Sequence, residues 1–198
     1  ITVENVYAFA TANPPGWRGT FRPASGNLVF TEVEVDASDG SDSDGGYGNV
    51  RAWDLSEYGS TSTLTLNRCR TRNYAHNSAI YIQGSGAMTL VMNSCDIQSY
   101  KRCINSENGS ANKTIIANDC VFRSTGPSWA VTEERMNDST QTYNRCVFWI
   151  NNANQQSFFI RGDKALNTTF NLDHCDLLRT AQASGTVFSL NQTTPGPC

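Results

Sequence analysis

Acidic side chains that could serve as a catalytic acid and base occur in the second half of the chain. Glu133, Glu134 and Asp163 follow apolar segments in successive repeats, and Arg161 accompanies them. Stacked repeats would place such carboxylates roughly 5 to 10 Å apart, a separation that suits a glycosidase or a lyase. Turns after exposed strands also collect charge, so a solvated surface explains the same residues. The four are therefore weak candidates for catalysis.

Aromatic residues recur in the loops of the early repeats and could contact the apolar face of a sugar ring. They are Trp17, Tyr47, Tyr74 and Tyr100. Consecutive coils would stack them on one side of the molecule. The alternative is that these loops simply pack on each other.

A glycine-rich acidic loop carries Asp39, Asp42 and Asp44. Carboxylate oxygens on a flexible turn suit Ca²⁺, but the spacing of a helix-loop-helix calcium site is missing. A solvated loop is favoured, so no cofactor is expected and calcium remains the alternative.

The elements that would position these residues follow from an internal repeat. Five segments align without gaps on a cysteine, and two earlier segments carry valine in the same slot. The slots are Val6, Val33, Cys69, Cys95, Cys120, Cys146 and Cys175. Successive slots are 25 to 36 residues apart, which is enough for one three-strand turn of a β-solenoid.

Each repeat predicts three short strands. Apolar residues alternate with polar ones before the slot, as in Leu64 and Leu66, so this first strand has one inward face. An asparagine stands two residues before the slot in four repeats, and we expect it to take a left-handed conformation at a sharp corner. A second strand follows the corner. Third strands are predicted at 20–22, 50–53, 79–82, 102–104, 129–131, 157–160 and 186–190.

This pattern resembles the pectate-lyase-like superfamily of right-handed parallel β-helices. The resemblance implies an all-β solenoid of about seven three-strand coils, and we expect a single domain over residues 1–198. The catalytic motifs of its enzymes are absent: His76 precedes Asn77, His174 precedes Cys175, and no Asp-Asp pair occurs. An enzyme is therefore disfavoured, and the fold alone does not indicate a function.

The cysteine slots predict a buried stack of thiols, because valine fills the same position in two repeats. Neighbouring rungs lie about 4.8 Å apart, within the range that a disulfide tolerates, so pairing along the stack stays open. Cys103 and Cys198 lie outside the stack, and the total of seven is odd.

Five N-glycosylation sequons are present, although a chain this rich in Asn, Ser and Thr would contain about as many by chance. They begin at Asn108, Asn112, Asn137, Asn167 and Asn191.

The composition favours an extracellular binding or structural protein. A net charge of -3 without a basic patch argues against nucleic acid, and no apolar run reaches a membrane span. The chain begins at Ile1 and not at Met, so we expect either a processed mature product or a piece of a longer chain, and we expect both ends of the solenoid to be uncapped. We expect a non-enzymatic structural or adhesive β-helix, secreted or on a cell or virion surface, that stacks end to end in a fibre and contacts glycans. The alternatives are a polysaccharide lyase or glycoside hydrolase, and a phage tailspike-like receptor-binding module.

Overall fold

A computed structural model describes residues 1–9, 18–23, 25–37, 50–55, 61–73, 78–83, 86–100, 102–106, 112–125, 132–134, 138–150, 158–161, 167–179 and 188–191. Within these residues every regular element is a β-strand. None of them forms a helix long and apolar enough to cross a membrane.

Three parallel sheets run the length of the molecule, and each holds seven strands. Sheet A contains β1 (Thr2–Glu4), β4 (Leu28–Thr31), β7 (Ser62–Asn67), β10 (Met88–Asn93), β13 (Lys113–Asn118), β16 (Thr140–Asn144) and β19 (Thr169–Asp173). Sheet B contains β2 (Tyr7–Phe9), β5 (Glu34–Asp36), β8 (Arg70–Asn73), β11 (Asp96–Ser99), β14 (Val121–Ser124), β17 (Val147–Ile150) and β20 (Asp176–Arg179). Sheet C contains β3 (Arg18–Phe21), β6 (Val50–Leu55), β9 (Ser78–Ile82), β12 (Arg102–Ser106), β15 (Thr132–Glu134), β18 (Phe158–Arg161) and β21 (Phe188–Asn191).

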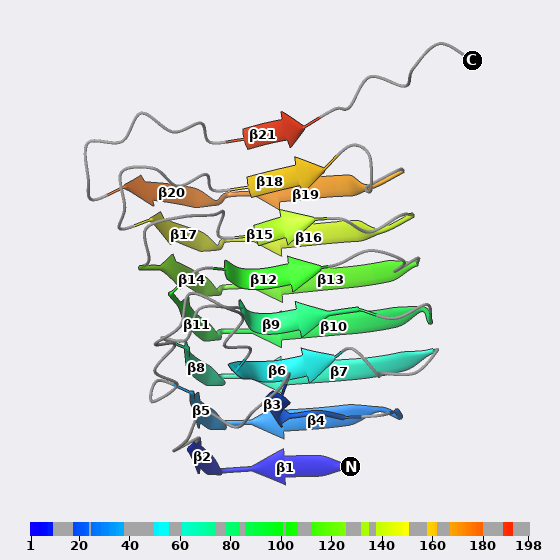
Figure 1. The fold of residues 1–198 in the computed structure, drawn as a ribbon, viewed down its shortest axis with the longest axis vertical. Helices are drawn as coiled ribbons and strands as arrows, with labels where there is room; N and C mark the ends of the chain where they lie inside the picture. The colour runs from blue at the N-terminus through cyan, green and yellow to red at the C-terminus, as the bar shows by residue number, and fades with distance from the viewer. Residues whose placement is uncertain are drawn as a thin grey trace.

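The chain contributes one strand to each sheet in turn and then begins the next coil, as Figure 1 shows from the blue N-terminal coil upward. Every pairing is in parallel register, for example Leu64 with Leu90 and Leu90 with Ile115. The expected all-β parallel solenoid is therefore confirmed.

Alternation of apolar and polar residues builds the core. In β7, β10 and β13 every second residue is buried, which is the period-two pattern of a strand with one inward face. Aromatic side chains also stack inside the core. Phe122 on β14 is in register with Phe148 on β17, and their rings stack with centroids 5.2 Å apart. Burial weakens in the last coil, where Leu172 is 37% and Leu177 39% exposed.

The corner between sheets A and B differs from the prediction. Each asparagine is the last residue of its strand, and the left-handed conformation belongs to the following residue, as at Arg68 (φ 51°) and Ser94 (φ 53°). The asparagines instead form a ladder in which Asn93 donates from Nδ2 to Asn67, Asn118 to Asn93 and Asn144 to Asn118, at 2.8–2.9 Å. The backbone N–H of the corner residue bonds the next coil, as from Arg68 to the Asn93 carbonyl at 2.8 Å, and this bond helps to offset the left-handed cost of about 1–2 kcal/mol.

The third strands lie close to their predicted positions with one exception. The strand expected at 129–131 lies outside the described residues, and the strand that pairs with β12 and β18 is β15, Thr132–Glu134.

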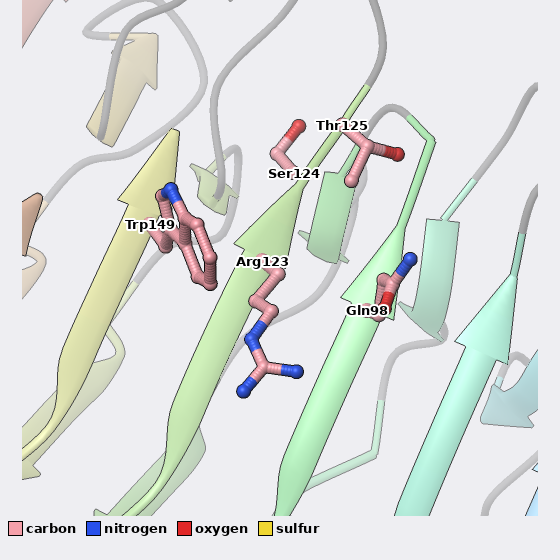
Figure 2. A pocket seen from close by; sticks show the side chains of 5 residues that line it. All are labelled: Gln98, Arg123, Ser124, Thr125 and Trp149. Carbon is pink, nitrogen blue, oxygen red and sulfur yellow. The ribbon is translucent and has the colours of Figure 1, made fainter. Parts of the chain in front are cut away.

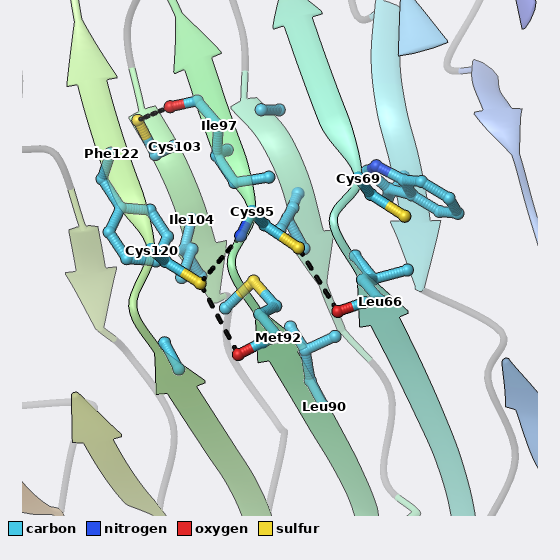
Figure 3. Packing of buried hydrophobic residues seen from close by; sticks show 14 of the residues in the cluster. Leu66, Cys69, Leu90, Met92, Cys95, Ile97, Cys103, Ile104, Cys120 and Phe122 are labelled. Atoms are coloured by element: carbon cyan, nitrogen blue, oxygen red, sulfur yellow. Dashed lines mark hydrogen bonds between the residues drawn. The ribbon is translucent and has the colours of Figure 1, made fainter. Parts of the chain in front are cut away.

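The cysteine slots form an inward column of free thiols (Figure 3). Cys69, Cys95, Cys120 and Cys146 are buried and Cys175 is half-buried. Each thiol donates to a carbonyl of the preceding coil, as from Cys95 to Leu66 at 3.3 Å and from Cys120 to Met92 at 3.5 Å. The column thus behaves as small buried side chains with weak hydrogen bonds.

Candidate functional site

The outer face of sheet B carries a cluster of charged, polar and aromatic side chains. Inward residues such as Ile97 and Phe122 are buried, so their neighbours in sequence point outward. One outward column contains, in register, Asp36, Arg72, Gln98, Arg123 and Trp149. The neighbouring column contains Glu34, Arg70, Asp96 and Val121. Parallel in-register stacking therefore gathers residues that are about 25 positions apart in sequence.

Arg123 lies in the middle of this face and contacts residues on both neighbouring strands. Its Nη1 donates to Asp96 Oδ2 at 3.0 Å, and its guanidinium carbon lies 5.4 Å from the ring centroid of Trp149. Figure 2 shows the Arg123 side chain between β11 and the Trp149 indole. About one third of the Arg123 and Asp96 side chains is exposed, so the pair is reachable from solvent.

Two adjoining cavities open along these strands. The first, of about 260 Å³, is lined by Gln98, Arg123, Ser124, Thr125 and Trp149 (Figure 2). The second, of about 340 Å³, is lined by Arg70, Thr71, Arg72, Asp96, Gln98 and Arg123. Because Gln98 and Arg123 border both, we treat them as one feature, the sheet B groove. It crosses four rungs from β8 to β17, a length of about 14 Å at the usual spacing of strands.

Several polar atoms in the sheet B groove have no hydrogen-bond partner among the described residues. They are Trp149 Nε1, Arg123 Nε and Asp96 Oδ1, and each is itself shielded from solvent. Two are donors and one is an acceptor. Leaving such groups unsatisfied costs about 1–3 kcal/mol each.

Arg70 and Arg72 line the other end of the groove. Both lie near the same carboxylate, with Glu34 Oε2 3.8 Å from Arg70 Nη1 and Glu34 Oε1 3.6 Å from Arg72 Nε. Both distances exceed that of a hydrogen bond. About half of each arginine side chain is exposed.

The predicted catalytic residues belong to a different sheet. Glu133 and Glu134 lie within β15 rather than after a strand, Arg161 ends β18, and Asp163 lies outside the described residues. In register, Glu133 pairs with Phe159 and Glu134 with Ile160. The structure therefore places three of the four in sheet C and not on the sheet B groove.

The other predicted sites fall mostly outside the described residues. Trp17, Tyr47 and Tyr74 lie there, and Tyr100 is half-buried just after β11. Asp39, Asp42 and Asp44 lie there as well, and no cluster of three metal-ligating side chains occurs among the described residues.

The sequons are described at three positions. Asn112 and Asn167 are exposed at left-handed turns with φ 56°, and Asn167 Nδ2 donates to Asp138 Oδ1 at 2.9 Å. Asn191 ends β21, while Asn108 and Asn137 lie outside the described residues.

Sequence reasoning missed the sheet B groove. The signal was present, because the outward residues of the second strands can be aligned on the cysteine slot. Alignment three residues after the slot gives Arg72, Gln98, Arg123 and Trp149.

Comparison of the chain with protein-family models, with curated proteins and with solved structures gives no match in any of the three. The sheet B groove is therefore interpreted from its own chemistry.

Proposed function

We propose that this protein is a polysaccharide-binding β-helix that holds a sugar chain in the sheet B groove. The observation that carries the proposal is the pairing of Trp149 with Arg123 beside a cavity of about 260 Å³. An indole ring offers an apolar face for a sugar ring, and the polar groups around it offer hydrogen bonds to hydroxyl groups.

The hydrogen-bonding inventory supports a sugar as the ligand. About one third of the Arg123 and Asp96 side chains is exposed, so Arg123 can donate to a sugar hydroxyl and Asp96 can accept from one. A hydroxyl group both donates and accepts, so adjacent hydroxyls of one ring can satisfy both kinds of atom. The groove is also elongated along the solenoid axis, which suits a chain rather than a single small molecule.

The proposed superfamily and biological role are inferred from this site and from the fold. Three short strands per coil and a left-handed corner support the resemblance to the pectate-lyase-like superfamily, and we propose an extracellular, adhesive role. End-to-end assembly stays a prediction, for which the sedimentation coefficient of the purified chain is the direct measurement.

Affinity electrophoresis tests the proposed function. The purified chain is run in gels that contain soluble galactan, glucan, mannan or xylan, or the charged derivatives of these polymers. We expect retardation by at least one polymer and a loss of affinity of at least about tenfold in Trp149→Ala. The control is Tyr7→Ala, which removes a ring that is 61% exposed on the same sheet, on β2.

Two outcomes would overturn the proposal. One is that no polymer retards the wild-type chain. The other is that Trp149→Ala, shown by circular dichroism to be folded, is retarded as strongly as the wild type.

A further inference from the structure

The lining of the second cavity, at the arginine end of the sheet B groove, carries more positive than negative charge. Three arginines and one aspartate line the cavity of about 340 Å³: Arg70, Arg72, Arg123 and Asp96. Asp96 is held by Arg123 at 3.0 Å. The carboxylates that neutralise the other two arginines, Arg70 and Arg72, therefore lie outside the cavity lining.

Glu34 neutralises only part of the positive charge of Arg70 and Arg72. It lies beside the cavity, one rung below Arg70, and its two oxygens are divided between Arg70 and Arg72 at 3.8 and 3.6 Å. Asp36, in register with Arg72, adds a second carboxylate on this face and also accepts a hydrogen bond from the Tyr7 hydroxyl at 3.5 Å. Within the described residues, neither Arg70 nor Arg72 donates a side-chain hydrogen bond.

The two arginines are held side by side by the strand. They stand two residues apart on β8 and point to the same face, with their Cα atoms about 6.6 Å apart. The two guanidinium groups repel each other, and Glu34 offsets part of this repulsion. A bound anion that accepts charge-assisted hydrogen bonds from both groups would offset more of it.

We propose that this end of the sheet B groove binds a sulfate ester of the bound polysaccharide, an inference that rests on the proposed sugar-binding function. A carboxylate is planar and pairs best with one guanidinium in its own plane. Arg70 and Arg72 approach from separate positions along one strand, and Gln98 borders the same cavity from the next strand. A sulfate ester has three terminal oxygens in a tetrahedral arrangement, so it can accept from donors in several directions.

The position of the sulfate subsite also limits the ligand. Arg72 on β8 and Trp149 on β17 are three rungs apart in one column, about 14 Å along the solenoid axis. One sugar ring cannot reach both. The bound segment therefore contains at least two sugar rings, with the sulfate ester on a ring other than the one that stacks on Trp149.

The test uses a sulfated galactan, its chemically desulfated form and a uronate polymer, with affinity measured for the full chain by isothermal titration calorimetry. We expect the sulfated form to bind at least about tenfold more tightly than the desulfated form. Arg72→Gln and Arg70→Gln should lower affinity for the sulfated form toward that of the desulfated form. Their affinity for the desulfated form should fall by less than their affinity for the sulfated form.

Arg68→Gln is the matched control, because Arg68 carries the same charge two residues earlier but pairs with Glu32 at 2.9 Å outside the groove. The proposal is overturned if sulfated and desulfated galactan bind equally. It is also overturned if only the uronate polymer binds, or if Arg68→Gln weakens binding as much as Arg72→Gln. Failure of the proposed function looks different, since Trp149→Ala would then leave the affinity for every polymer unchanged.

Discussion

Arg123 donates from Nη1 to Asp96 Oδ2 at 3.0 Å across neighbouring strands, 27 residues apart in sequence. This bond fixes the guanidinium at the centre of the sheet B groove, where its Nε has no partner among the described residues. Asp96 is thus a positioning residue for Arg123.

Asp96→Asn should weaken polysaccharide binding by about threefold to tenfold, because Arg123 loses its charged anchor. The unfolding free energy should change by less than about 1 kcal/mol, since the pair is partly exposed. Calorimetric titration and urea denaturation measure the two effects. Asp119→Asn is the control: Asp119 accepts two bonds from Arg145, at 2.7 and 2.8 Å, away from the groove. Equal losses of affinity in both variants would contradict the prediction.

The asparagine ladder predicts a graded loss of stability. Asn118 both donates to Asn93 and accepts from Asn144, whereas Asn67 accepts from Asn93 at the end of the ladder. Each bond contributes about 0.5–1.5 kcal/mol, so Asn118→Ala should cost about 2 kcal/mol and Asn67→Ala about half as much. Urea denaturation with an unchanged slope measures both. A larger loss for Asn67→Ala would show that the ladder does not carry the effect.

The fold could be predicted from the sequence because the repeat alone determines how the coils stack. A gapless alignment on the slot from Cys69 to Cys175 specifies the inward residues of every coil, and the parallel register follows from it. The corner was misassigned by one residue because asparagine tolerates a left-handed backbone and also forms amide ladders. The sequence could not distinguish a left-handed corner from an amide ladder, because the ladder needs the asparagine of the neighbouring coil as its partner.

The candidate site was harder to predict for a related reason. Trp149 and Arg123 matter because they are adjacent in one column, and that adjacency depends on the outward face of the second strands. Sequence reasoning looked for ligands in loops, where functional residues concentrate, and so selected Trp17 and Tyr47. The outward residues that pair across sheet B are 25 or more positions apart in sequence, and only the register between coils places them together.

Burial of the cysteine column, and of Cys103 outside it, predicts slow thiol chemistry. Burial raises the pKa of the Cys103 thiol, which lies 3.3 Å from the carbonyls of Ile97 and Arg123. In Cys198→Ser, which removes the cysteine outside the described residues, Ellman's reagent should modify half-buried Cys175 first and the buried thiols only on unfolding. All six remaining thiols should react in denaturant without a reductant. A lower total would indicate disulfides along the column.

Lys113 predicts a specific dependence of stability on pH. Its side chain is 1% exposed and its Nζ donates to the Gly86 carbonyl, and burial lowers the pKa of the ammonium group. Between this lowered pKa and about 10.4, the folded state binds fewer protons than the unfolded state. Stability therefore rises with pH across that window, and below it the buried charge is a standing cost.

Replacement of Lys113 isolates this effect. Lys113→Met, which copies its register neighbour Met88, should remove the rise in unfolding free energy that the wild type shows as the pH increases toward about 10.4. Lys113→Arg should also lack the rise, because a guanidinium stays charged, but its stability should be lower throughout. Urea denaturation at several pH values compares the three chains. If Lys113→Met followed the same pH profile as the wild type, the rise would have to come from groups other than this ammonium.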